Sequence, residues 1–244
     1  MLISIKYDPH LTSLFPELCT HCIYIDGLDK DANFDNIIND NIEYALKNLA
    51  QIGKESSFHS ISLWREAYRK VGVDPTKFRI APESLLRRLR TKGEIPSHLH
   101  PLVLLCNSFS VKLALPIAVL DAECINGNLT IKFSNGIETY TSFSGEKTKL
   151  LAGEVSFIDE KNIAHARKWS HKQSLDSVIT NKTKSAIVFI ESLLPFNGNY
   201  IYQSSIDEII SAISLAWPNS KIHKTFKNKG ELNSEIINLK DFKI

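Results

Sequence analysis

The chain has 244 residues, of which 43% are hydrophobic; this content is enough to bury a sizeable core and excludes a disordered protein. The 29 Lys and Arg residues nearly balance the 27 Asp and Glu residues, so the formal net charge of +2 predicts no general affinity for an anionic partner. Four cysteines are too few and too scattered for a disulfide scaffold, and no run approaches the roughly 20 apolar residues of a membrane span. We therefore expect a cytoplasmic protein that does not enter a membrane.

The first half of the chain reads as two strands followed by helices. "MLISIKYDP" and "CTHCIYIDGL" are typical of strands that end at a proline and a glycine. Helical spacing of apolar residues predicts helices over 33–53 and 61–72. Pro82 and Gly93 mark the start and end of a third helix, and a fourth runs from about Pro101 to Ala114.

The second half is dominated by predicted strands. Two Asn-Gly pairs, at 126–127 and 135–136, separate three β-like runs after Pro116 and predict a three-stranded meander. Three more stretches are expected to contribute strands, and one a late helix: 149–159, 167–174 and 185–194 for the strands, 205–217 for the helix. The basic tail, 221–244, is expected to be loosely held. Helices, then strands, then a helix predict an α+β fold with a mainly antiparallel sheet, in a single domain over 1–244.

Basic residues cluster in two segments. Residues 65–92 hold nine basic and three acidic residues, and residues 161–184 hold six basic residues and one acidic residue. Solvated surfaces explain most of these charges, but both clusters also suit an anionic partner such as RNA phosphate. An alternating run in the second cluster would place His165, Arg167, Trp169 and His171 on one face, able to contact phosphate and stack on a base. The simpler interpretation is a solvated cationic strand with one core tryptophan.

Sequence motifs for common catalytic chemistry are absent. The chain has no GxGxxG, Walker A, HExxH or GxSxG pattern. This argues against a dinucleotide-binding protein, a P-loop NTPase, a zincin metalloprotease and an α/β-hydrolase of the usual kinds. "CTHC" provides two thiols and an imidazole between Cys19 and Cys22, but no second ligand pair follows. We therefore expect neither a metal nor a cofactor.

Two carboxylates occupy unusual positions. Glu191 follows a run of apolar residues, where an unpaired charge would cost several kcal/mol. Glu154 follows Gly153, a residue that lets the backbone approach a ligand closely. Each carboxylate is either paired or functional, and Arg79 is one candidate partner for either. These alternatives stay open at this point.

Four stretches together resemble the B3/B4 domain, the editing module of the bacterial phenylalanyl-tRNA synthetase β subunit. They are "APESLLRRL", "NSFSVKLALPIAVLD", "LAGEVSFID" and "TKSAIVFIES", and their order and spacing carry the resemblance. It spans about 64–194, within a B3/B4-like core of about 60–195, and is closer still to free-standing proteins built from this domain. The resemblance implies an α+β fold, with flanking helices and sheet around a central pocket.

The resemblance also implies site residues. The Asn of the family motif corresponds to Asn107, and the family's glutamate that reads a tyrosine hydroxyl corresponds to Glu191. The glycine at the pocket floor corresponds to Gly153, and the arginine before the Pro-containing helix to Arg79. Our catalytic candidates are therefore Asn107 and Glu191, and our substrate-binding candidates are Arg79, Ala118, Gly153 and, from its own position in the sequence, Glu154. Ala118 stands where the family motif has a histidine, so that histidine's role in placing water cannot be transferred. The RNA-binding candidates are Arg87, Arg88, Arg167, Trp169 and Lys172. We expect Asn107 and Glu191 to converge on one partly buried hollow with a positive rim.

The activity that the resemblance implies is hydrolysis, in trans, of the ester that joins a wrong amino acid to tRNA. The partners would be the aminoacyl acceptor end of tRNA and a small amino-acid-like ligand. The alternative is a non-catalytic pocket protein that binds a free amino acid or a related metabolite, and an enzyme of unrelated chemistry is a third reading. Whether the chain is an enzyme, here an aminoacyl-tRNA deacylase, therefore stays open, as does its oligomeric state.

Overall fold

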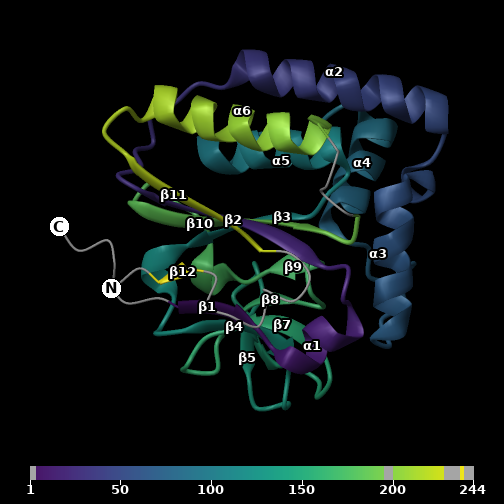
Figure 1. The fold of residues 1–244 in the computed structure, drawn as a ribbon, viewed down its shortest axis with the longest axis vertical. Helices are drawn as coiled ribbons and strands as arrows, with labels where there is room; N and C mark the ends of the chain where they lie inside the picture. The colour runs from purple at the N-terminus through teal and green to yellow at the C-terminus, as the bar shows by residue number, and fades with distance from the viewer. Residues whose placement is uncertain (1–3, 195–199, 228–236, 239–244) are drawn as a thin grey trace.

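The computed structural model describes residues 4–194, 200–227 and 237–238 and shows two stacked sheets with helices over one of them (Figure 1). The helices are α1 (Pro9–Leu14), α2 (Asp35–Ile52), α3 (His59–Lys70), α4 (Ala81–Lys92), α5 (Pro101–Leu113) and α6 (Tyr200–Ala216). The strands are β1 (Ser4–Tyr7), β2 (Cys19–Asp26), β3 (Ile117–Asp121), β4 (Leu129–Phe133), β5 (Thr139–Thr141), β6 (Lys147–Lys149), β7 (Val155–Ile158), β8 (Ala164–Arg167), β9 (Lys172–Gln173), β10 (Ser185–Ser192), β11 (Lys221–Lys227) and β12 (Ile237–Asn238). Most strand pairs are antiparallel, which confirms the predicted α+β fold class.

The four-stranded sheet, in the order β11-β2-β10-β3, forms the middle layer. Successive side chains of a strand point to opposite faces, and β10 is buried on both. Ile187 and Phe189 face the core between the two sheets, whereas Val188 and Ile190 face the core beneath α5 and α6. Figure 1 shows α5 and α6 lying over this sheet, with α2 beyond them. β10 therefore separates two hydrophobic cores.

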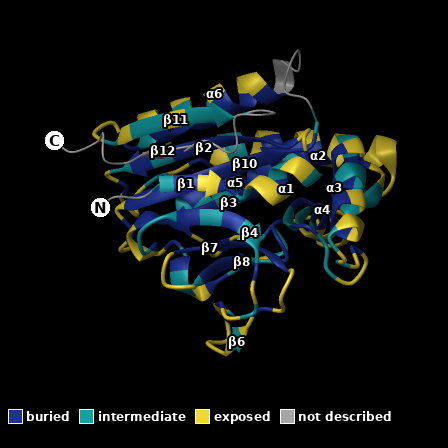
Figure 2. Ribbon diagram, turned by 60° about the horizontal axis from the view of Figure 1, so that its bottom comes forward, coloured by how far each residue is buried: buried dark blue, intermediate teal, exposed yellow. Residues whose placement is uncertain are grey.

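The six-stranded sheet has the order β12-β1-β4-β7-β8-β9 and forms the lower layer. Tyr7, Phe157 and Trp169 fill the space between the sheets, and all three are buried. In Figure 2 the buried residues follow the stacked strands, while exposed residues mark the outer helices and the β5–β6 hairpin. No helix in the described part of the chain is both long and apolar enough to span a bilayer.

The ends of α4 and α5 are determined by local sequence, as predicted. Pro82 lies in the first turn of α4, where its missing N–H costs nothing, and Gly93 ends the helix in the left-handed conformation with a φ of 74°. Pro101 starts α5 in the same way, and the Nδ1 atom of His100 accepts a hydrogen bond from the Leu102 amide at 3.2 Å. These two helices form one wall of the site described below.

The predicted three-stranded meander is wrong. β3 belongs to the four-stranded sheet, β4 to the six-stranded sheet, and β5 pairs with β6. The Asn-Gly turns are held by distant or neighbouring carboxylates instead of closing two-residue hairpins: Asn126 donates to Asp159 at 2.7 Å, and the amides of Asn135 and Gly136 donate to Glu138 at 3.0 Å. The chain thereby passes from one sheet to the other.

The expectation of a loose tail is also wrong for its first residues. β11 pairs antiparallel with β2 along its whole length, and the rings of Phe226 and His21 lie 4.5 Å apart. Ile237 and Asn238 form β12 and pair with β1. Residues 228–236 and 239–244 lie outside the described residues. The single domain over 1–244 and its core of about 60–195 stay a proposal.

Candidate functional site

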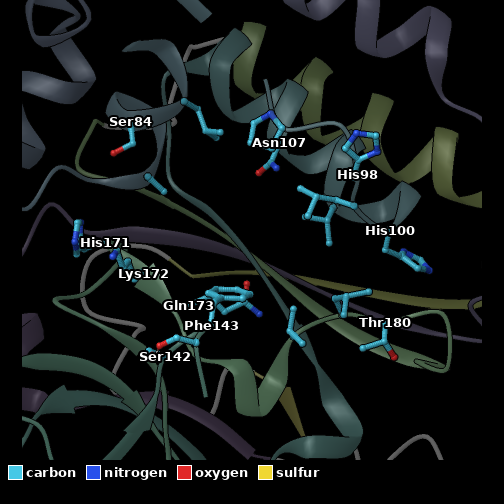
Figure 3. Close-up of a pocket in the computed structure, with 18 of the residues that line it drawn as sticks. Ser84, His98, His100, Asn107, Ser142, Phe143, His171, Lys172, Gln173 and Thr180 are labelled. Atoms are coloured by element: carbon cyan, nitrogen blue, oxygen red, sulfur yellow. Dashed lines mark hydrogen bonds between the residues drawn. The ribbon is translucent and has the colours of Figure 1, made fainter. Parts of the chain in front are cut away.

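A pocket of about 1070 Å³ lies beside β3, the edge strand of the four-stranded sheet (Figure 3). α4 and α5 form one wall, and three segments of strand end and loop form the other: 140–144, 171–173 and 178–181. Gln173 lines the pocket, and its side-chain amide donates to the Val119 carbonyl on β3 at 2.8 Å. This volume matches the upper range of small-molecule sites and can hold a ligand of nucleotide size.

The pocket lining carries no acidic group. None of its residues, all in the described part of the chain, is Asp or Glu. Its polar groups include Lys172, three histidines and several amides and hydroxyls, and its apolar groups include Leu85, Val103 and Phe143. The lining therefore suits a ligand that combines an apolar part with neutral or negatively charged polar groups.

Asn107 is placed in the pocket by the geometry of α5. Leu105, Cys106 and Phe109 on this helix face the core against the four-stranded sheet, which turns half-buried Asn107 toward the pocket. Figure 3 shows its amide across the pocket from Gln173. Among the described residues the Asn107 side chain has no hydrogen-bond partner, so the amide is available to a ligand.

Residues 168–171 form a sharp turn between β8 and β9, which corrects the continuous strand expected over 167–174. β8 ends at Arg167, and both Lys168 and Trp169 adopt left-handed conformations, with φ of 46° and 60°. Such a pair of non-glycine residues persists only where contacts enforce it. The Trp169 amide donates to the Val155 carbonyl at 2.7 Å, and the Tyr68 hydroxyl donates to the Lys168 carbonyl at 2.8 Å. The turn breaks the predicted alternation and brings residues 171–173 to the pocket.

Glu191 lies in the core between the sheets, away from the pocket. It is 1% exposed, and its Oε1 atom accepts hydrogen bonds from the Tyr7 hydroxyl at 2.7 Å and the Trp169 indole at 2.9 Å. The Ser170 hydroxyl donates to Oε2 at 3.2 Å. Burial raises the pKa of Glu191, against the opposing effect of these three donors. Asn107 projects from a helix on the other face of β10, so the expected convergence of the two side chains is not observed.

Glu154 is paired with two cations of the same turn. Its oxygens accept hydrogen bonds from the Arg167 guanidinium at 3.1 Å and from the Lys168 ammonium at 2.9 Å. Burial acts to raise the pKa of Glu154, but these hydrogen bonds hold it below its usual value. Gly153 lies in the exposed loop before β7 with a φ of 85°, so backbone conformation accounts for the glycine. Both residues lie outside the pocket.

Arg79 and Ala118, both predicted to bind substrate, do not line the pocket. The Arg79 Nε atom lies 4.0 Å from Glu83, so the inward pairing with Glu154 or Glu191 is wrong. Its backbone carbonyl instead lies 2.7 Å from Nδ1 of His171. Ala118 is opposite Phe189 in the sheet and packs against the core between the sheets.

The five residues predicted to contact RNA differ in their availability. Arg87 lies 3.8 Å from Glu55 and Arg88 lies 2.5 Å from Glu94, in partly exposed ion pairs on α4. Arg167 is held by Glu154 over the Tyr140 ring, and Lys172 is exposed beside the pocket. Trp169 is 0% exposed, which corrects the expectation that its ring stacks on a base.

Two residues were not predicted from the sequence to line a pocket. Phe143, in the turn between β5 and β6, is 61% exposed and lines the pocket, a rare setting for a large aromatic ring. His171 lines the pocket with Nδ1 bound to the backbone. Two features of the sequence could have pointed to them. Phe143 is a large aromatic residue in a polar turn that contains Gly145, and His171 stands where the segment 169–173 departs from the family pattern.

Comparison with known protein families identifies the chain. The model of the B3/4 domain family matches residues 63–207, more than half of the 244 residues, and the chain belongs to this family. Among solved structures, an N-terminal fragment of the phenylalanyl-tRNA synthetase beta-subunit from Pyrococcus horikoshii is similar, with a TM-score of 0.48 and 9% sequence identity. The match covers 90% of this chain and 50% of that one, so this chain spans about half the length of the fragment. No curated protein matches the chain.

Proposed function

We propose that this B3/4 domain protein binds the acceptor end of tRNA in the pocket and hydrolyses a mischarged aminoacyl ester there, in trans. The observation that carries the proposal is the large, acid-free pocket with the unpartnered Asn107 amide on its wall. Family membership supports it, because the B3/B4 domain that the sequence resembles is an editing module.

The pocket has the groups that a terminal nucleotide needs. Exposed Phe143 offers a ring on which a base can stack, and base stacking on aromatic side chains is tolerant of sequence. Lys172 is exposed on the lining and offers a cation for phosphate. Arg87 and Arg88 lie one turn beyond the pocket-lining part of α4 and extend this cationic surface. These residues replace buried Trp169 as the proposed RNA contacts.

The alternative, a pocket for a free amino acid, is less consistent with the charges. The ammonium group of a free amino acid is ordinarily bound by a carboxylate, and the lining supplies none. An aminoacyl ester carries the same ammonium, but the phosphates of the attached nucleotide outweigh its charge. The pocket therefore favours a nucleotide-linked ligand.

Asn107 is proposed to act on the ester directly. Its amide N–H can donate to the ester carbonyl oxygen as negative charge develops there during attack by water. Glu191 is proposed to act as a positioning residue, since it holds Trp169 and Ser170 immediately before the pocket segment. Glu154 positions the start of the same turn through Lys168.

For the other residues predicted to bind substrate, we propose roles that involve no contact between their side chains and the ligand. Arg79 is proposed to act through its carbonyl contact with His171. Ala118 and Gly153 are proposed to shape the strand and loop near the pocket without touching a ligand.

The test is deacylation of a panel of tRNAs, each charged with a wrong amino acid. We expect ester hydrolysis above the buffer rate for at least one member, and a loss of about 10²-fold in kcat/KM for Asn107→Ala, as for removal of a transition-state donor. Asn36→Ala, at an exposed position of α2, is the matched control and should retain the wild-type rate. A wild-type protein that hydrolyses none of the esters would overturn the proposal.

A further inference from the structure

We propose that His171 is the general base of this pocket, whose Nε2 atom accepts a proton from the water that attacks the ester. The inference deepens the proposed function and rests on it. It assigns the imidazole chemistry to a residue on the turn after β8, whereas the family's own motif position holds Ala118.

The hydrogen bond of His171 determines its tautomer. Its Nδ1 atom lies 2.7 Å from the Arg79 carbonyl oxygen, and a carbonyl oxygen can only accept. Nδ1 therefore carries the ring proton, and in the neutral ring Nε2 keeps its lone pair. No described residue hydrogen-bonds Nε2, and His171 lines the pocket. This is the state that a general base requires.

The surroundings keep the imidazole neutral. Burial lowers the pKa of His171 from its ordinary value of 6.5, and the nearby cations Lys172, Lys168 and Arg167 lower it further. The hydrogen bond to Arg79 acts in the opposite direction but does not reverse the shift. From the segment before α4, the Phe78 ring meets the imidazole edge to face at 5.4 Å, and the pocket side carries no acid. At pH 7 the ring is therefore available to accept a proton.

The turn also holds His171 in place. The Lys168 carbonyl accepts hydrogen bonds from the Tyr68 hydroxyl at 2.8 Å and from the His171 amide at 3.3 Å. Ser170, the preceding residue, is bound to Glu191, and its carbonyl accepts the Ala81 amide at 2.9 Å. A catalytic side chain is effective when neighbouring contacts lock its position.

The other two histidines of the pocket are less suited. The Nδ1 atom of His100 accepts the Leu102 amide and so caps α5. Its lone pair is thus already used. His98 is exposed on the loop before α5, with no described contact that orients its ring. His171 alone among the three combines an anchored Nδ1 with an open Nε2.

The proposed step balances without a further reactant. The water oxygen bonds to the ester carbonyl carbon while its proton moves to Nε2 of His171. The bond from that carbon to the ribose oxygen then breaks, and the imidazolium returns the proton to the departing ribose oxygen. The products are a free amino acid and uncharged tRNA, and the imidazole is neutral again.

The test is His171→Asn, whose side-chain amide can still donate to the Arg79 carbonyl but has no atom at the Nε2 position. We expect kcat to fall about 10²-fold or more, as for loss of a general base, with KM within about threefold of wild type. His10→Asn, exposed on α1, is the matched control and should retain the wild-type rate.

A second measurement needs no variant. The wild-type rate should rise with pH and reach half its plateau below pH 6.5, because the base must be neutral. A His171→Asn protein with wild-type kcat, or a wild-type rate that is flat between pH 5 and 7, would overturn the role of His171 while the proposed function stands. A wild-type protein inactive on every ester overturns both.

Discussion

Glu191 shows how a buried carboxylate can serve structure near a site without entering it. Its carboxylate oxygens accept hydrogen bonds from Tyr7 on β1 and from Trp169 and Ser170 in the turn that leads to the pocket. A buried acceptor shared by several donors fixes their relative positions. Asn107 has the opposite setting, since its amide faces the pocket and has no described partner.

Two substitutions separate these roles of Glu191. Glu191→Ala leaves the buried Tyr7 hydroxyl and Trp169 indole N–H without an acceptor, and we expect the free energy of unfolding to fall by about 2–4 kcal/mol. Glu191→Gln keeps an acceptor oxygen for both donors and removes a charge that burial disfavours, so we expect a change within about 1 kcal/mol. Urea denaturation measures both. Equal losses for Ala and Gln would show that the negative charge itself is required.

The turn between β8 and β9 is the element that joins structure to site. It holds two left-handed residues, and Glu154 binds Lys168 through both its amide and its ammonium group. The turn therefore depends on a carboxylate from the loop before β7. The two regions are brought together by the antiparallel pairing of β7 with β8.

The pH dependence of stability in a Glu154→Gln variant tests the role of Glu154 in this turn. The substitution leaves the Lys168 ammonium, 10% exposed, without its anion, and we expect a loss of about 2 kcal/mol in the free energy of unfolding at pH 7. The folded-state pKa of Glu154 is lowered, so its stabilisation is present above the unfolded-state pKa of about 4.3 and is lost as pH falls through the folded-state value. The difference between wild type and variant should therefore shrink below about pH 4. A difference that stays constant from pH 7 to pH 3.5 would contradict this pairing.

At the scale of the whole molecule, both basic clusters of the sequence lie at the pocket. The pocket lies between α4 and α5 on one side and residues 140–144, 171–173 and 178–181 on the other (Figure 3). The basic clusters of 65–92 and 161–184 include α4 and the turn between β8 and β9, so both reach the pocket. The protein is nearly neutral overall, and this local concentration of cations is what would attract a polyanion.

Salt dependence measures whether such attraction exists. We expect tRNA affinity to fall steeply between 50 and 200 mM salt, with a log–log slope of about −2 or steeper, because phosphate contacts release counterions. Lys172→Ala should make the slope shallower by about 1, whereas Lys47→Ala, in an exposed pair with Glu43 on α2, should leave it unchanged. Affinity that is indifferent to salt would favour the metabolite-binding alternative.

Part of the site could not be predicted from the sequence, because contacts between segments separated along the chain determine its backbone conformation. Asn107 was selected through the resemblance to the B3/B4 domain, and it lies in the pocket. Trp169 was assigned to an RNA surface because alternation was assumed to continue past Arg167, whereas two left-handed residues reverse the chain there. That conformation is imposed by contacts outside the local sequence: Tyr68 lies 100 positions from Lys168, and Glu154 lies 14 positions from it beside Val155.

Local sequence determined α2, α4, α5, β2 and β10, because apolar spacing and the prolines and glycines at helix ends act within a turn or two of the chain. The assignment of β3 and β4 to different sheets, the pairing of β11 with β2 and the separation of Asn107 from Glu191 arose only in the folded molecule. They depend on contacts such as Glu191 opposite Thr20, between residues more than a hundred positions apart. Such contacts form by burying one face of each strand against distant partners, and no local pattern encodes which partner that is.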